Sequence, residues 1–521
     1  MPACIDECLT GAPSTCEQVT SGSACLSTAC TGPDLAAAQN LLAPYAACMC
    51  DGDCGSSNTN NGGEPCLDDY AVRLGVTALP DDTSNEYKAY FCKYTELRAP
   101  NGKPIRIYGQ DQVTTLQLYR ARSILNFYLT NYSCSSGVEC FGRDKSAIAN
   151  AMADNGAILD MPNGAHEQPG AGLSLFGQEL YAAETPVEGG AWYMENDMEH
   201  RDAAFEEILH LVHDNGIGID KPGYMTGAAG EFQELIREAT TFNQATWLTP
   251  AGNGNWGEGD ADWINELAEE GSLTQEYLAA VIDTYYGLWD LYGAGMWGSY
   301  AASKREELAA IDAKGLDVVE RFFSPRLTWM VYLSPELGAG TTFQLDFDES
   351  EGASNPKHAY KSRYIDHVNL LGENDSNMRG NGNDNCFGVN AGDNVVDGKE
   401  GALDVLMLRG SRTDYTWSKD KSTVTDGVEG RDGITRPLNI DVVSYLDFAE
   451  VWSSEEEGSL NYRDQVIKCW DLVGVDWAGE VEEGEEEGEE GDGEEEGIDF
   501  TQDGSAATTP TKSQHLITWS L

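Results

Sequence analysis

Cysteines are distributed very unevenly along the chain, and this constrains the first part of the fold more than any other feature. Nine of the 14 cysteines lie between Cys4 and Cys66. Such a cluster is typical of a small disulfide-bonded module in an oxidising compartment. A zinc module is the alternative, because Cys48, Cys50 and Cys54 are closely spaced, but residues 1–66 contain no histidine and no repeated CxxC pair. We therefore expect a disulfide module and a secreted, extracellular protein.

The net charge excludes two classes of partner. Asp and Glu number 88 against 32 Lys and Arg, which gives −56, and −43 remains without the 13 acidic residues of segment 480–499. Such a surface repels nucleic acid and anionic lipid and attracts divalent cations, and it also suits a saline environment. No stretch approaches the ~18–20 apolar residues of a membrane span. The first residues lack the basic and apolar regions of a signal peptide, so a removed signal, a fragment and signal-independent export all stay open.

The length of 521 residues exceeds what one hydrophobic core supports, so we expect an α+β multidomain fold. The predicted segments are a cysteine-rich module (1–66), a mixed α/β part (67–160), a mainly helical part (161–333), a β-rich part (334–477) and an acidic, disordered tail (478–521). Within the mixed part, apolar spacing predicts a strand over 105–108 and a helix over 113–129.

One helix of the central part carries a candidate metal site. Its apolar face follows helical spacing and consists of Phe205, Ile208, Leu209 and Val212. Glu206, His210 and His213 lie on a neighbouring stripe, where residues four apart are close enough to share one ion. A Gly-x-Gly at 216–218 ends the helix. The alternative is a structural helix in which Glu206 and His210 only hydrogen-bond to each other.

Two motifs in this region resemble those of zincin metallopeptidases. Glu206-Glu207-Ile-Leu-His210 is similar to the zincin signature His-Glu-x-x-His, with glutamate in place of the first histidine. Downstream, Gln275-Glu276-Tyr-Leu-Ala-Ala-Val-Ile-Asp283 resembles the Glu-Phe-Phe-Ala-Glu-Ala-Phe helix of gluzincins related to the catalytic domain of anthrax lethal factor. The resemblance covers about residues 170–325. It includes Gln178–Glu184, which we interpret as the zincin edge strand, and a closing segment at 304–323.

The resemblance implies a zinc site and a peptidase activity. Glu206, His210 and Glu276 would hold zinc, and Glu207 would be the general base for a zinc-activated water. Two carboxylates neutralise the ion more fully than the usual ligand set, which makes that water less acidic, and Ala280 stands where the family motif carries a second glutamate. Rival third ligands are His213, Glu231 and Glu234.

The β-rich part contains a nine-residue repeat. Asp375, Asp384 and Asp393 recur at this interval among glycines, although Ala391 stands where a glycine is expected and Asp404 falls two residues late. The pattern resembles the parallel β-roll of RTX proteins, and segments 408–417 and 428–449 resemble the region that follows such repeats. The resemblance covers about residues 365–452 and implies calcium, a hard cation that prefers oxygen ligands. The implied calcium ligands are Asp375, Asp384, Asp393, Asp397 and Asp404.

Two functions follow from these patterns. The first is a secreted zincin-like metallopeptidase, or a catalytically impaired relative, that binds a polypeptide substrate along the edge strand by β-augmentation. The second is a non-catalytic adhesion, matrix or surface protein, in which the cysteine module and the β-roll bind extracellular components. The loss of the first motif histidine favours the second function, and the order of strand, Glu-Glu-x-x-His helix and Glu276 helix favours the first.

Overall fold

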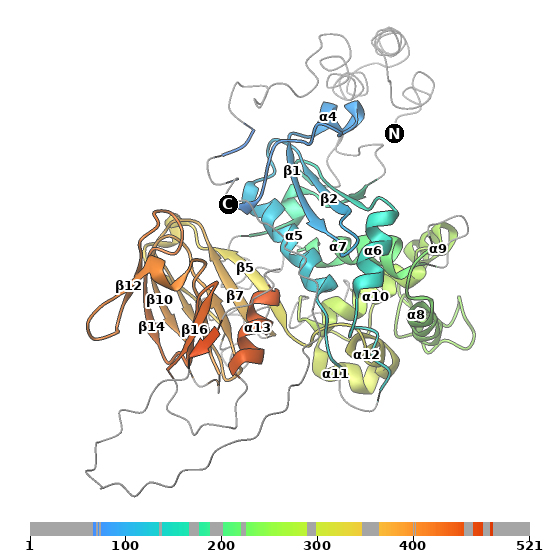
Figure 1. Ribbon diagram of the computed structural model, residues 1–521. Helices are drawn as coiled ribbons and strands as arrows, with labels where there is room; N and C mark the ends of the chain where they lie inside the picture. The colour runs from blue at the N-terminus through green and yellow to red at the C-terminus, as the bar shows by residue number, and fades with distance from the viewer. Residues whose placement is uncertain are drawn as a thin grey trace, which may run out of the picture.

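The computed structural model places most of the chain between Cys66 and Glu482 (Figure 1). The described residues are 66–68, 71, 74–134, 138–165, 177–187, 202–219, 226–288, 298–345, 364–399, 401, 403–452, 462–472 and 480–482. The predicted cysteine module, apart from Cys66, and the acidic tail beyond Glu482 lie outside these residues. None of the helices in the described part has both the length and the apolar character that a membrane crossing needs.

A four-stranded sheet forms the first part of the fold, in the order β1-β2-β3-β4. Its strands are β1 (Lys93–Arg98), β2 (Pro104–Gly109), β3 (Ile158–Met161) and β4 (Gln178–Glu179), and its helices are α4 (Asn85–Tyr90), α5 (Thr115–Leu129) and α6 (Ser146–Asp154). β1 and β2 are antiparallel, whereas β2, β3 and β4 are parallel. The strand predicted over 105–108 and the helix predicted over 113–129 are confirmed as β2 and α5.

α5 begins where the sequence supplies a capping box. The Thr114 hydroxyl accepts from the backbone N–H of Gln117 at 3.2 Å, and the Gln117 side chain accepts from the N–H of Thr114 at 2.8 Å. These bonds satisfy two of the polar groups that a helix end leaves unpaired. Leu118, Ala121 and Leu125 then pack into the core with no exposed surface.

The central part is mainly helical, as predicted. It contains α7 (Ala204–Val212), the π-helical turn η4 (His213–Ile217), α8 (Gly230–Asn243), α9 (Ala261–Glu270), α10 (Leu273–Tyr285), α11 (Arg305–Ile311) and α12 (Ala313–Glu320). Gly218 follows η4 with φ 104°, a conformation that glycine adopts readily, so the predicted Gly-x-Gly stop is confirmed. The predicted edge strand Gln178–Glu184 is wrong in length. β4 covers only Gln178–Glu179, and a 3-10 turn occupies Ala182–Glu184.

The β-rich part winds between two sheets (Figure 1). The strands of one sheet are β5 (Leu327–Tyr332), β7 (Ile365–Leu371), β9 (Cys386–Gly388), β11 (Val405–Met407), β15 (Val442–Ser444), β16 (Phe448–Val451) and β17 (Glu480–Glu482). Those of the other are β6 (Thr341–Gln344), β8 (Ser376–Arg379), β10 (Asp393–Asp397), β12 (Tyr415–Trp417), β13 (Val424–Asp426) and β14 (Ile434–Leu438). From β5 to β11, successive strands alternate between the sheets. Each strand from β5 to β9 pairs in parallel with the strand two positions further along the chain.

Several features of this part differ from the sequence expectation. β5 precedes residue 333 but belongs to the β-rich part, and one buried core runs from Ala71 to Tyr445 through both the helical and the β-rich parts. Glu480–Glu482, which lie near the start of the predicted disordered tail (478–521), instead form β17 in parallel with β16. Tail residues beyond Glu482 lie outside the described part.

Three disulfides connect described cysteines: Cys66–Cys92, Cys134–Cys140 and Cys386–Cys469. The last joins β9 to α13 (Tyr462–Leu472). Val466 and Trp470 of α13 are buried, and the Trp470 ring N–H donates to Ser444 Oγ at 2.8 Å. The disulfide therefore holds α13 against the sheet that contains β9 and β15.

Candidate metal centre

α7 is fixed at its N-terminus by a buried ion pair. Asp202 Oδ1 accepts from the Ala204 N–H at 3.1 Å and from Arg120 Nη1 at 3.1 Å, and both side chains are almost fully buried. The carboxylate also lies where the helix dipole is positive. The Arg120 guanidinium lies 4.8 Å from the Trp329 ring and 5.8 Å from the Phe205 ring. This contact connects α5, α7 and β5, so the helix that carries the candidate ligands has a defined position.

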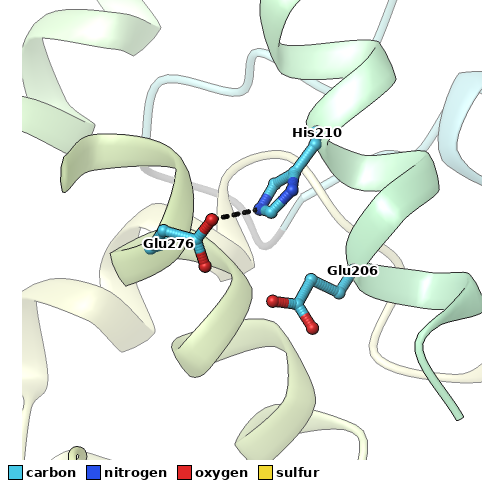
Figure 2. A group of neighbouring side chains, drawn as sticks. All are labelled: Glu206, His210 and Glu276. Carbon is cyan, nitrogen blue, oxygen red and sulfur yellow. Dashed lines mark ion pairs between the residues drawn. The ribbon is translucent and has the colours of Figure 1, made fainter. Parts of the chain in front are cut away.

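Glu206, His210 and Glu276 lie close together in the structure. Glu206 and His210 lie one turn apart on α7, and Glu276 extends toward them from the first turn of α10 (Figure 2). One ligand atom from each lies within 4.8 Å of the others. Among the described residues, this is the one group of three or more His, Cys, Asp or Glu side chains that meets this geometry. A single small cation can therefore contact all three.

The electrostatics of this group are dominated by its carboxylates. Nε2 of His210 lies 3.6 Å from Glu276 Oε1, and Nδ1 lies 3.5 Å from Glu207 Oε2. Burial alone would lower the pKa of His210, but Glu276, Glu207 and Asp214 outweigh it and raise the pKa to about 9. Without another cation, a protonated imidazole balances part of the negative charge.

The register of β4 determines which side chain meets Glu207. Gln178 pairs with the fully buried Leu159, so the two side chains share one face of the sheet, and β4 packs against α7. Its Nε2 donates to Glu207 Oε2 at 2.7 Å. Sequence reasoning placed Gln178 in the edge strand but missed this contact, because only strand pairing reveals the face.

The rival third ligands lie elsewhere. His213 is fully buried, and its Nε2 lies 2.6 Å from Gln233 Oε1, so it connects η4 to α8. Glu231 and Glu234 are exposed on α8, and Glu234 pairs with Arg237. Of the candidates from the sequence, Glu276 is the one that reaches Glu206 and His210.

The five aspartates predicted as calcium ligands do not gather into one site. Two of them instead accept from the backbone of the next coil of the β-rich part. Asp375 accepts from the Asp393 N–H at 2.9 Å, and Asp384 accepts from the Leu403 N–H at 3.1 Å. Asp397 accepts from the Asn439 side chain at 2.7 Å. These aspartates therefore hydrogen-bond one coil of the β-rich part to the next.

Asp404 differs from the other four aspartates in its burial and in the acidic groups around it. It is fully buried, its Oδ1 accepts from the Asn385 N–H at 2.8 Å, and its Oδ2 has no hydrogen-bond partner in the described part. Burial raises the pKa of Asp404 to about 8, and repulsion from Asp441, Asp384 and Asp397 adds to the effect. Asp441 was not among the sequence candidates, because it lies outside the nine-residue repeat that marked them.

Comparisons of the chain with known proteins identify no relative. No protein-family model matches the chain, and neither the characterised proteins nor the solved structures contain a match. The resemblance to zincins and to RTX repeats therefore stays a prediction based on short motifs, and the convergence of Glu206, His210 and Glu276 is a property of this chain's own fold.

Proposed function

We propose that the chain is a secreted, metal-dependent peptidase whose cation is held by Glu206, His210 and Glu276. The observation that carries the proposal is the convergence of these three side chains from α7 and α10. The residues fit the ion, because carboxylate oxygen and imidazole nitrogen are ligands of zinc. Nε2 of His210 also makes no hydrogen bond within the described part, which leaves a nitrogen facing the site.

When bound, zinc would supply Lewis acidity and lower the pKa of a water into the neutral range. The chain's residues would do the rest. Glu207 lies next to Glu206 on α7 and supplies the carboxylate that accepts a proton from the attacking water. β4, at the edge of its sheet, offers backbone groups that orient an extended peptide.

The test is metal content together with hydrolysis. Full-length protein purified without chelator should contain close to one zinc per chain and should cleave casein. His210→Ala and Glu276→Ala should lose both properties. Glu207→Gln should lose hydrolysis, whereas Glu234→Ala, on the exposed face of α8, should match the wild type. A wild-type chain with no tightly bound transition metal would exclude this function.

We also propose that calcium stabilises the β-rich part. The parallel winding of its strands, the buried carboxylate of Asp404 and the acidic residues around it support this proposal. The disulfides and the overall negative charge support secretion into a calcium-containing, oxidising environment.

The second candidate function is a non-catalytic extracellular surface or matrix protein. Its specific support is the glutamate at the first motif position, which gives the candidate site two carboxylates and one imidazole. A chain that binds stoichiometric metal but cleaves neither casein nor unfolded peptides would favour this candidate over the peptidase.

A further inference from the structure

Three side chains form a continuous chain from the edge of the first sheet to the candidate cation site. Gln178 on β4 donates from Nε2 to Glu207 Oε2 at 2.7 Å. The same oxygen of Glu207 lies 3.5 Å from Nδ1 of His210. The opposite ring nitrogen, Nε2, lies 3.6 Å from Glu276 and faces the site (Figure 2).

An imidazole that binds a cation through Nε2 carries its hydrogen on Nδ1. An acceptor at Nδ1 therefore fixes both the tautomer and the orientation of the ring. Glu207 is placed to be that acceptor, because it lies three residues before His210 on the same face of α7. The amide of Gln178 donates to the Glu207 carboxylate, which has 23% of its side-chain surface exposed, and this bond helps to restrain its orientation.

We propose that Gln178 and Glu207 are positioning residues that orient His210 for its cation. The inference rests on the proposed cation site and gives Glu207 a role beyond that of a general base. It also assigns a role to Gln178, which the motifs do not mark. A residue that acts only as a base affects turnover but not cation affinity, so affinity separates the two roles.

Register provides a matched control on the same strand. Glu179 follows Gln178 on β4 but pairs with Asp160, so it shares the opposite face of the sheet and binds the Tyr181 hydroxyl at 2.8 Å. Gln178→Ala and Glu179→Ala remove neighbouring side chains from one strand. Only the first breaks the chain to His210.

The experiment measures the Kd for Zn²⁺ and Co²⁺ by competition with a chromophoric chelator on the full chain. Glu207→Ala should weaken binding by about 10–100-fold, the usual effect of removing a group that orients a ligand. Gln178→Ala should weaken binding by a smaller factor, and Glu179→Ala should leave it unchanged. Glu207→Gln should bind more tightly than Glu207→Ala, because its amide oxygen still accepts from Nδ1, yet it should not hydrolyse peptide.

A second readout is the ring Nδ1–H of His210 in the zinc-loaded chain, followed by ¹H and ¹⁵N NMR. Its proton signal should be shifted downfield and protected from exchange in the wild type, and both features should be lost in Glu207→Ala. If Glu207→Ala does not fold, the Gln178→Ala and Glu179→Ala pair carries the test. Equal affinities in the wild type and Glu207→Ala, or equal losses in the two strand variants, would overturn the inference alone. A wild-type chain without measurable affinity would overturn the cation site itself.

Discussion

The buried pair of Arg120 and Asp202 should contribute far more to stability than an exposed pair of similar geometry. Asp202→Ala removes the carboxylate from a guanidinium that lies 4.8 Å from the Trp329 ring and 5.8 Å from the Phe205 ring. The side chains of Arg120 and Asp202 are 2% and 1% exposed, so water cannot replace the lost carboxylate.

The expected cost follows from two contributions. Breaking a buried ion pair by removing one partner typically costs ~3–5 kcal/mol. Loss of the acceptor for the Ala204 N–H at the start of α7 adds about 1 kcal/mol. The double variant Arg120→Met/Asp202→Ala should recover most of the loss, because methionine fills the space against the two rings without an unpaired charge.

The assay is urea unfolding at neutral pH, followed by far-UV circular dichroism, for both single variants and the double variant. The matched control is the exposed pair Lys103–Asp154, which has an N–O distance of 2.7 Å and side chains 61% and 55% exposed. Asp154→Ala should cost no more than ~1 kcal/mol. If Asp202→Ala costs no more than Asp154→Ala, or the double variant is no more stable than Asp202→Ala, the argument from burial is refuted.

Three further perturbations test other parts of the fold. Burial lowers the pKa of Lys145 to about 7. Between about pH 7 and 10 the unfolded chain therefore keeps the Lys145 proton that the folded chain has lost, so the free energy of unfolding should rise with pH across that window. Lys145→Met should flatten this rise when unfolding in urea is measured at several pH values. Calcium removal should lower the melting temperature, and Asp404→Asn should reduce the difference between melts in calcium and in chelator; an unchanged wild-type melt would contradict the calcium proposal. Replacing Cys386 and Cys469 by alanine removes a disulfide between residues 83 positions apart. Because the unfolded chain then gains conformational entropy, the β-rich part should be destabilised by about 4–5 kcal/mol, which differential scanning calorimetry can measure.

Local patterns in the sequence were sufficient to identify several helices and two of the three residues of the candidate site. The spacing of Phe205, Ile208 and Leu209 defined a buried helical face, and helical geometry then placed Glu206 and His210 one turn apart. These features depend only on the 3.6-residue period, so they follow from sequence without tertiary information. The edge strand was predicted less well. Apolar residues at 180–183 suggested a longer strand, but the chain turns after Glu179.

Only the tertiary structure showed which of the rival candidate ligands lies beside Glu206 and His210. Glu276 was suggested by resemblance, and Glu231, Glu234 and His213 were equally available from spacing along the chain. The packing of α10 against α7 brings Glu276 to His210 and leaves the two α8 glutamates exposed. The contact of Gln178 with Glu207 likewise depends on the pairing of β4 with β3.

The sequence by itself determined which residues share a helical face and which segments are rich in cysteine, glycine or acid, because these depend on neighbours within a few positions. The tertiary structure decided which of these faces meet. That outcome depends on packing between elements far apart in the chain, where a shift of one strand position exchanges the two faces of a sheet and would separate Gln178 from Glu207.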